Sequence, residues 1–399
     1  MLASVVYFIA CHGGPADHFS TFSEELTQRG HTVQIYATGP ALKKFREKKR
    51  EDAIPFSLDD LSEEEAATLL AKNCSVADAV ITDVGHPFDI ALQKALRQEA
   101  PASRRLAYYD NPEAYVPGGY SLIASQVMAE AEAVLFANGN LIHALEIDLL
   151  PEKRIGLGYY PTAQAEKIGA RRKNEHNTLR AELFAKYSLL DKGQKVLVYA
   201  GSNNEEYFTK AFPAFLELLG GVDLSETILV LHQHPGAKEK NRDAKLIQAW
   251  NGKTAPFILS ELTTDDAQVV ADVLLYYQTS MGPQFVLAGI STIQVGHEVY
   301  EDILVRNGLC YTATTSDALA YALTHLPGNV DKTKILAGLG LCPNWADRLE
   351  AVLERALKEK ISLVRNEQNS HWTQNTGRNA LRNLFCSQDH RGEIEQAMK

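Results

Sequence analysis

Several acidic side chains that could transfer a proton follow apolar runs in the first half of the chain. Asp83 comes directly after the run at residues 79–82, and Asp89 lies six residues beyond it. Asp110 follows the run at residues 106–109 in the same way. Functional groups of open α/β sheets gather where parallel strands end, so a carboxylate here can act as an acid or base, or orient a histidine. Each aspartate could equally be a helix cap or a turn residue.

Hydroxyl side chains that could hold a phosphate follow an apolar run in the second half. The run at residues 273–277 leads to Thr279 and Ser280, and a helix-like segment with Gln284 in its first turn comes next. Free backbone N–H groups at a helix N-terminus favour an anion such as a diphosphate, and the two hydroxyls would add donors. Gln284 could reach a ribose or a base. For this stretch alone, an ordinary connection with a helix cap is the alternative.

The same order of strand, loop and helix occurs twice along the chain. The apolar run at residues 4–10 precedes the loop CHGGPADHF, in which Gly13 and Gly14 allow the backbone to approach a ligand. A helix over residues 19–29 follows this loop. The second half restarts the order with a strand at residues 195–200. Two such sets predict an α/β protein with two Rossmann-like doubly wound domains that face each other across a cleft.

The chain of 399 residues is too long for one ordinary core, which supports two domains. We place the N-terminal domain at residues 1–160 and the C-terminal domain at residues 186–345. Between them, residues 161–185 are interpreted as a linker and a docking helix, because the pattern weakens there around the charged run ARRKNEH. Residues 346–399 are predicted to form C-terminal helices.

The composition, with 45% hydrophobic and 23% charged residues, is that of an ordinary globular protein. A net charge of −10 argues against a nucleic-acid surface. No apolar run approaches the roughly 18 residues of a membrane-spanning helix, and the first residues lack the positive start of a signal peptide. Five cysteines without a CxxC pattern are interpreted as reduced thiols. These features predict a cytoplasmic protein.

The basic run ALKKFREKKRED at residues 41–52 could contact an anionic membrane surface. Only Leu42 and Phe45 offer apolar side chains in it, which favours an ordinary solvated helix. A peripheral membrane contact remains one alternative for this run.

The start of the chain resembles the first motif of the GT-B fold of nucleotide-sugar-dependent glycosyltransferases. GGPADHF, a helix and TQRGHTVQIYATG are similar to the glycine-rich loop, helix and RGH-containing strand of that family. His18 lies five residues after Gly13, like the loop histidine of the family. It also lies 12 residues before Gly30. This spacing is about three residues shorter than in the family, a difference close to one helical turn. His12 and Asp17 are therefore the alternatives for the catalytic base.

Motifs in the second half resemble the donor-binding domain of the same fold. VLVYAGSNNEE is similar to the family's GS turn, and LVLHQHPG resembles the His-Pro turn of transferases that build bacterial surface polymers and sialosides. Gln284 stands five residues before Gly289, where many members have a ribose-binding glutamate. The donor site that the resemblance implies comprises Gly13, Gly14, Ser202, His234, Thr279, Ser280, Gln284 and Glu298.

The resemblance implies transfer of a sugar from a nucleotide sugar to an acceptor hydroxyl, with no metal or other cofactor. His18 would accept the proton of the hydroxyl, and Asp83 or Asp110 would orient the imidazole. Hydroxyls and His234 would stabilise the leaving nucleotide diphosphate, which we expect to be UDP. The sequence identifies neither the acceptor nor the oligomeric state.

Two other functions fit the same fold. A UDP-sugar 2-epimerase needs several carboxylates in the cleft, and Glu298, Glu301 and Asp302 could supply some of them. A non-catalytic module would bind a nucleotide sugar without turnover, and Gln284 in place of the usual glutamate is compatible with that function.

The resemblance also implies a last helix that crosses back onto the N-terminal domain. Residues 344–361 form an amphipathic pattern with Leu349, Val352 and Leu353 on one side. The residues proposed for the contact itself are Trp372, Leu381, Leu384 and Phe385.

Overall fold

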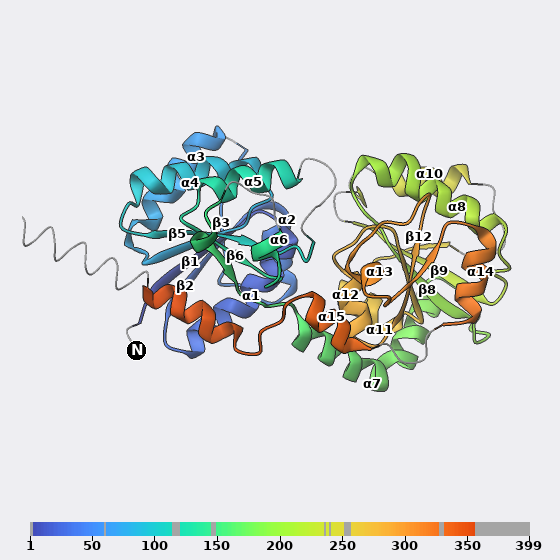
Figure 1. The fold of residues 1–399 in the computed structure, drawn as a ribbon. Helices are drawn as coiled ribbons and strands as arrows, with labels where there is room; N and C mark the ends of the chain where they lie inside the picture. Colours follow the sequence, from blue (N-terminus) through green and yellow to red (C-terminus); the bar gives the residue numbers. More distant parts are fainter. Residues whose placement is uncertain are drawn as a thin grey trace, which may run out of the picture.

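The computed structural model describes residues 3–59, 61–113, 120–144, 149–234, 237–238, 241–250, 257–326 and 331–355. Within these residues, two parallel β-sheets are each packed between helices, and the two α/β units lie side by side (Figure 1). This architecture confirms the predicted fold class of two doubly wound domains.

The first sheet has seven parallel strands in the order β3-β2-β1-β4-β5-β6-β7. Successive β1 side chains enter opposite layers, with Phe8 in one core cluster and Ile9 in another. The strand order changes direction between β1 and β4, so the loops after these strands leave a crevice at the carboxyl edge. The strands are β1 Val5–Ala10, β2 Thr32–Ala37, β3 Ile54–Pro55, β4 Ala79–Thr82, β5 Arg104–Tyr109, β6 Ala133–Phe136 and β7 Arg154–Gly156. The helices are α1 Gly13–Gln28, α2 Gly39–Glu47, α3 Glu63–Asn73, α4 Pro87–Glu99, α5 Tyr120–Glu130 and α6 Leu141–Ala144.

The second sheet has six parallel strands in the order β10-β9-β8-β11-β12-β13. Here the order changes direction between β8 and β11, which creates a second crevice. The strands are β8 Lys195–Ala200, β9 Thr227–His232, β10 Phe257–Leu259, β11 Val273–Tyr276, β12 Ser291–Val295 and β13 Tyr311–Ala313. The helices are α7 Thr162–Lys186, α8 Phe212–Gly220, α10 Arg242–Ala249, α11 Thr264–Val270, α12 Gly282–Leu287, α13 Ile303–Arg306, α14 Ser316–Thr324 and α15 Lys332–Gly338, and a π-helix at Tyr207–Ala211 precedes α8.

The segment interpreted from the sequence as a linker followed by a docking helix is the single continuous helix α7. Ile168 near its start and Phe184 near its end are both buried in the core of the second sheet. The charged run in its middle contacts α11, where Arg172 donates to the carbonyl oxygens of Gln268 and Val269. Arg172 therefore supplies hydrogen-bond donors to carbonyl oxygens at the C-terminal end of α11. The charged run does not mark a linker.

Two neighbouring chain segments connect the sheets, one at residues 157–161 and one at residues 339–344. The Cys342 N–H donates to the Gly158 carbonyl oxygen at 2.9 Å, which joins the two segments. Gly158 has a φ of +69°, and a Cβ there would lie 2.7 Å from the Gly340 carbonyl oxygen. The crossing is thus too close for a side chain at this position.

After this crossing, a helix at residues 345–355 packs on the first sheet, beside α1 (Figure 1). Leu349 and Leu353 are fully buried in the core cluster of that sheet. Glu350 accepts a hydrogen bond from Arg29, at 2.6 Å. The chain therefore returns to the N-terminal unit, although Trp372, Leu381, Leu384 and Phe385 lie outside the described residues.

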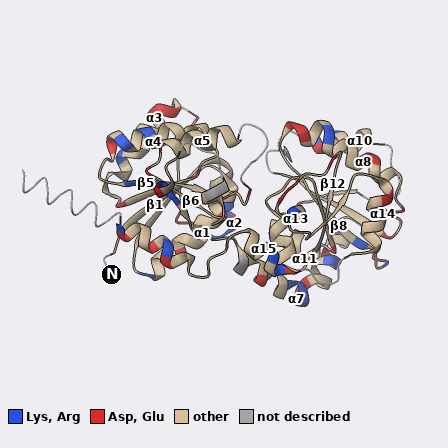
Figure 2. Ribbon diagram, in the orientation of Figure 1, with Lys and Arg blue, Asp and Glu red and all other residues tan. Residues whose placement is uncertain are grey.

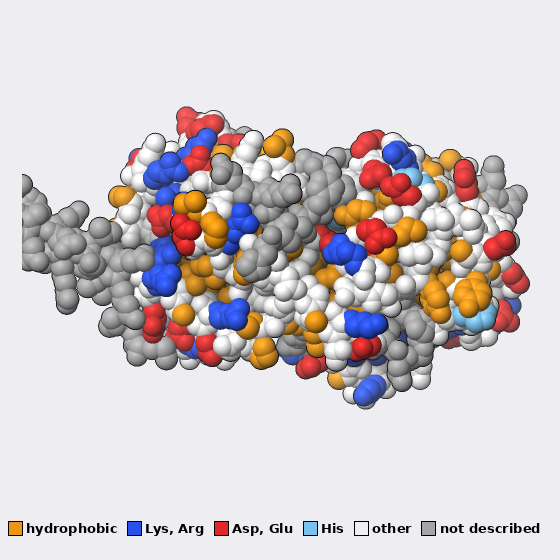
Figure 3. Space-filling model, viewed as in Figure 1, with side chains coloured by type: hydrophobic (Ala, Val, Ile, Leu, Met, Phe, Trp, Pro, Cys, Tyr) orange, Lys and Arg blue, Asp and Glu red, His pale blue; other side chains and the backbone are white. Residues whose placement is uncertain are grey.

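The basic run around α2 is largely neutralised by neighbouring carboxylates. Arg46 pairs with Glu51, and Lys48 lies 2.8 Å from Asp17. Basic and acidic residues are interspersed along the helices in Figure 2, and their side chains are interspersed over the face shown in Figure 3. The local pairing favours the solvated helix over a membrane contact, which stays untested.

Among the residues that the structure describes, no helix combines the length and apolar character needed to cross a membrane. The described cysteines are free thiols at positions 11, 74, 310 and 342, whereas position 386 lies outside the described residues.

Candidate functional site

A pocket lies between the carboxyl edges of the two sheets. The first sheet contributes the loop after β5, and the second contributes the loops after β8, β9, β11 and β12. Its volume of about 240 Å³ is slightly below the roughly 300–1,000 Å³ of small-molecule sites, so a nucleotide sugar would fill it and extend beyond it. The lining residues are Asn111, Pro112, Glu113, Gly201, Ser202, Asn204, His234, Gln278, Thr279, Ser280, Pro283, Tyr300, Asp302, Ile303 and Leu304.

His12 and Asp83 lie against each other at the crevice of the first sheet. His12 is the N-cap residue of α1, and Asp83 directly follows β4. His12 Nδ1 lies 3.4 Å from Asp83 Oδ2, which also accepts hydrogen bonds from the backbone N–H groups of Cys11 and His12. Burial acts to lower the pKa of His12, but the contact with Asp83 outweighs it and raises this pKa above its usual value. Nδ1 is buried beside Asp83 without a hydrogen bond to any described residue, so Nε2 is the ring nitrogen that could act on a substrate.

Asp110 lies beside this pair, at the end of β5. The Tyr120 hydroxyl donates to Asp110 Oδ1 at 3.2 Å. Gly14 makes room for Asp110, because a Cβ at Gly14 would collide with the Asp110 carboxylate. Burial, together with the nearby charge of Asp83, raises the pKa of Asp110 to about 6. Its carboxyl group can therefore hold or release a proton near neutral pH.

His18 lies inside α1, in the sixth position of the helix, and is only 5% exposed. Its Nδ1 is 2.5 Å from the Tyr108 hydroxyl, and its ring packs edge-on against Tyr159. Burial lowers the pKa of His18 to about 4, and its charged neighbours are Asp17 and Lys48. The structure thus brings His12, one of the two alternatives, next to the candidate carboxylates and leaves His18 in an aromatic cluster. The other alternative, Asp17, is ion-paired with Lys48.

Side chains of the second sheet join two pocket loops. Asn204 Nδ2 donates to Ser202 Oγ at 3.2 Å and to Gln278 Oε1 at 2.9 Å. These bonds hold the turn after β8 against the turn after β11. A polar surface built this way offers hydroxyl and amide groups to a phosphate or a ribose.

The expected pair Thr279 and Ser280 lines the same pocket. Thr279 Oγ1 accepts a hydrogen bond from the Met281 N–H at 3.2 Å, just before α12 begins. The Ser280 carbonyl oxygen accepts from the Tyr160 hydroxyl, which belongs to the crossing segment. This loop is therefore attached to the connection between the two sheets.

His234 lines the pocket from the loop after β9. Burial lowers the pKa of His234, and the charge of His12 lowers it further. The two histidines are therefore within electrostatic reach of each other across the cleft. A neutral His234 ring can still donate a hydrogen bond to a phosphate oxygen from one nitrogen.

No protein-family model matches this sequence, and no curated protein sequence matches it significantly. Solved structures do match. The UDP-GlcNAc 2-epimerase of Methanocaldococcus jannaschii is 11% identical with a TM-score of 0.63, over 88% of this chain and 99% of that one. The UDP-GlcNAc 2-epimerase of Neisseria meningitidis, bound to UDP-GlcNAc, is 11% identical with a TM-score of 0.58, over 89% and 100%. A glycosyltransferase of Rickettsia africae is 13% identical with a TM-score of 0.53, over 94% and 99%.

This chain has the GT-B fold. The matches extend over 88% and 94% of this chain and over 99% of each of the two solved structures. At these identities the likeness establishes the fold alone, so the site has to be argued from its own residues.

Four of the eight donor residues expected for the GT-B fold lie outside the lining of this pocket, namely Gly13, Gly14, Gln284 and Glu298. Gln284, in the first turn of α12, accepts a 3.4 Å hydrogen bond from Gln268 of α11. Glu298 is largely exposed and accepts a hydrogen bond from the Tyr277 hydroxyl, and His297 Nε2 lies 3.6 Å from it. Gly13, also assigned to the donor, forms the first turn of α1 together with Gly14.

Sequence reasoning missed Glu113, which lines the pocket from the first sheet. Its Oε1 accepts from the Ile303 N–H at 2.6 Å, and its Oε2 lies 2.7 Å from Arg306. It therefore connects the N-terminal unit to the start of α13. The only signal was its position in the turn after Asp110, and nothing in that turn distinguishes it from an ordinary solvated glutamate.

Asn204 and Gln278 were also missed, although both stand next to assigned residues. Asn204 follows the GS turn by two residues, and Gln278 precedes Thr279. Their amides bond to each other across two loops that are 74 residues apart, which a local pattern does not reveal.

Proposed function

We propose that this protein is a nucleotide-sugar-dependent glycosyltransferase in which His12, oriented by Asp83, is the catalytic base. The observation that carries the proposal is the contact of His12 with the buried Asp83 at the crevice of the first sheet, together with the polar side chains that line the pocket between the two sheets. A base on one side and hydroxyl, amide and imidazole groups on the other are what sugar transfer requires.

In this reaction the acceptor hydroxyl oxygen bonds to the anomeric carbon while the bond from that carbon to the nucleotide diphosphate breaks. The hydroxyl proton passes to His12 Nε2, because Nδ1 faces Asp83. The diphosphate leaves with the bonding electron pair, and its growing charge meets the donors of Ser202, His234 and Thr279. We retain UDP as the expected nucleotide, with no metal assigned.

A UDP-sugar 2-epimerase is the second candidate. It is favoured by Asp110, whose pKa of about 6 suits a group that both gives and takes a proton. The matched structures named as UDP-GlcNAc 2-epimerases add to this candidate, although their likeness establishes only the fold.

One experiment separates the candidates. The full chain is incubated with UDP-, GDP-, CDP-, CMP- and TDP-sugars, with and without a panel of acceptor alcohols, and the released nucleotide and sugars are measured. A transferase releases nucleotide only when an acceptor is present. An epimerase forms a second sugar, or its unsaturated form plus UDP, from UDP-GlcNAc alone. Nucleotide binding without turnover in every combination would identify a non-catalytic module and contradict the proposal.

The pH dependence of turnover should report the state of His12. Because His12 must be neutral to accept a proton, kcat/KM should rise with pH through its pKa, which Asp83 holds above the usual value of about 6.5. Asp83→Asn removes the charge that raises this pKa, so the rising limb should move to lower pH while the plateau falls. An unchanged limb in Asp83→Asn would exclude this pair as the base.

Nucleotide affinity should depend on Gln278. Gln278→Ala removes a pocket side chain and its bond to Asn204, and we expect about tenfold weaker UDP binding, the scale of one polar contact. Gln194→Ala is the matched control, because Gln194 precedes β8 at the opposite edge of the same sheet. Isothermal titration with UDP measures both variants. Equal affinities in the two variants would place the nucleotide elsewhere.

A further inference from the structure

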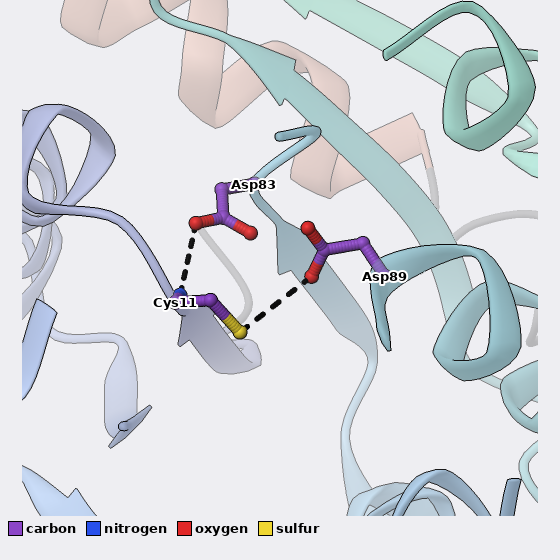
Figure 4. Close-up of side chains that lie close together, drawn as sticks. All are labelled: Cys11, Asp83 and Asp89. Carbon is purple, nitrogen blue, oxygen red and sulfur yellow. Dashed lines mark hydrogen bonds between the residues drawn. The ribbon is translucent and has the colours of Figure 1, made fainter. Parts of the chain in front are cut away.

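A second buried carboxyl group lies behind the His12–Asp83 pair. Asp89 belongs to the first turn of α4, and its side chain points toward Asp83 and Cys11 (Figure 4). One carboxylate oxygen of each aspartate and the Cys11 sulfur all lie within 4.8 Å of one another. Both aspartates are completely buried. The proposed mechanism assigns no role to Asp89.

The hydrogen bonds around the two carboxyl groups differ. Asp83 Oδ2 accepts from two backbone N–H groups, at Cys11 and His12, and faces the His12 ring. Asp83 Oδ1 is buried and has no hydrogen-bond donor among the described residues unless a neighbouring acid supplies one. Asp89 Oδ2 accepts from a single backbone N–H, that of His86, at 2.9 Å, and Asp89 Oδ1 accepts from the Cys11 thiol at 3.9 Å.

Two ionised carboxylates at this separation in a water-free site would repel each other strongly, so one of them carries a proton. The two backbone N–H donors stabilise the Asp83 anion, whereas Asp89 accepts from one backbone N–H and from a thiol, which is a weak donor. Burial raises the pKa of Asp89 well above its usual value, and the charge of Asp83 raises it further. Burial alone would raise the pKa of Asp83, but hydrogen bonds with His12 and Asp89 lower it. The proton therefore belongs to Asp89.

We propose that Asp89 is a positioning residue whose protonated carboxyl group donates a hydrogen bond to Asp83 Oδ1 and so holds Asp83 as the anion that orients His12. The effect of Asp89 on catalysis rests on the proposed function, whereas the hydrogen bond from Asp89 to Asp83 does not. The donated bond satisfies the buried oxygen that otherwise lacks a partner, which a merely packed side chain would not do.

Other ionisable groups within reach come from six elements. Cys11 and His12 follow β1, and His86 caps α4. Glu63 at the start of α3, Asp110 after β5, Tyr120 at the start of α5 and His234 after β9 act at longer range. A titration of His12 therefore reports the sum of these charges, and the test compares variants that change only Asp89.

The decisive comparison is Asp89→Asn against Asp89→Leu in the full chain. Asparagine keeps an N–H donor for Asp83 and an oxygen for the His86 N–H, whereas leucine keeps neither. We expect Asp89→Asn to retain the pH midpoint of the His12 titration, measured by NMR in the absence of substrate. Its turnover should stay within about threefold of the wild-type value. In Asp89→Leu the midpoint should fall by about one pH unit, because an unpaired buried Asp83 becomes easier to protonate, and turnover should fall at least about tenfold.

Glu65→Ala controls for the helix cap that Asp89→Leu also breaks. Glu65 occupies the same position in the capping box of α3 but is exposed and remote from Asp83. The Glu65→Ala variant should unfold at a lower temperature, whereas the pH midpoint of its His12 titration should not change. If Asp89→Leu fails to fold, isotope-edited infrared spectra still decide, since the protonated carboxyl band of the wild type at pH 7 should vanish in Asp89→Asn.

Three results would overturn the inference. One is an unchanged His12 midpoint in both Asp89 variants, and another is an Asp89→Asn variant that behaves like Asp89→Leu. The third is a stoichiometric metal in the wild type that both variants lose, which would make Cys11, Asp83 and Asp89 a cation site. If instead the His12 midpoints shift as expected while no protein shows turnover, the positioning role stands and the proposed reaction fails.

Discussion

Replacing His12 by glutamine is expected to lower turnover by roughly 10²-fold or more, the usual scale of general-base catalysis. His12 lies at the crevice of the first sheet, with its Nδ1 3.4 Å from the buried carboxylate of Asp83. Glutamine fills similar space and can still donate to Asp83, but it cannot accept a proton near neutral pH. UDP affinity should change little, because His12 is not among the residues that line the pocket and the hydroxyl and amide side chains there belong mostly to the second sheet. Single-turnover kinetics together with UDP titration measure both quantities.

His18→Ala is the matched control, because it removes the histidine that the sequence singled out. His18 is buried against Tyr108, so its loss should cost on the order of 1–3 kcal/mol of stability and leave the Tyr108 hydroxyl unpaired. At a temperature where the variant is folded, its turnover should stay near that of the wild type. Full activity in His12→Gln, combined with a loss of turnover in His18→Ala, would mean that His18 is the catalytic base.

The two histidines illustrate where the sequence pattern stops being informative. The glycine pair at positions 13 and 14 was interpreted as a loop, and the helix was expected to begin at residue 19. In the structure these glycines and Pro15 form the first turn of α1, which begins directly after His12. Proline is tolerated in a first turn, and glycine has no preference that would fix the boundary. Because the helix begins six residues earlier than expected, His18 faces the core and His12 lies at the carboxyl edge of the sheet.

The fold itself was readable because it depends on averages over many residues. Central strands of both sheets, such as β4 and β11, are short and fully buried runs, and each is followed by a polar or glycine-containing turn. Such runs alternate with helices twice along the chain, which leaves few arrangements other than two parallel sheets. Asp83 and Asp110 were located for the same reason, since both stand at the ends of such runs.

Which face a short helix turns toward a pocket, in contrast, cannot be predicted from a few residues. Gln284 was assigned to the donor because of its place in the first turn of a helix after Thr279 and Ser280. Pro283 lines the pocket instead, and Gln284 faces Gln268 of α11. A rotation of about 100° per residue separates these two neighbours, so an error of one position reverses the interpretation.

The second prediction with a large effect concerns the crossing between the two sheets. Gly158→Ala should destabilise the protein by about 3 kcal/mol, because the alanine would have to adopt a φ of +69° and its Cβ would meet backbone atoms. Those atoms are the Gly340 carbonyl oxygen at 2.7 Å and the Cys342 nitrogen at 2.9 Å. Both belong to the second crossing segment, which cannot move without breaking the bond from the Cys342 N–H to the Gly158 carbonyl oxygen. Denaturant unfolding, followed by tryptophan fluorescence, measures the loss.

Gly193→Ala separates backbone strain from collision. Gly193 has a φ of +78°, but a Cβ there would have nothing within 4 Å, so only the cost of the left-handed conformation remains, about 1–2 kcal/mol. The excess loss in Gly158→Ala over Gly193→Ala is therefore the free energy of forcing the two crossing segments apart. Because Tyr160 of the first segment also bonds to the Ser280 carbonyl oxygen, this displacement should reach the pocket and weaken UDP binding in Gly158→Ala alone. Equal losses of stability in the two variants, with UDP affinity intact in both, would mean that the crossing is loose and that the two sheets are not coupled through it.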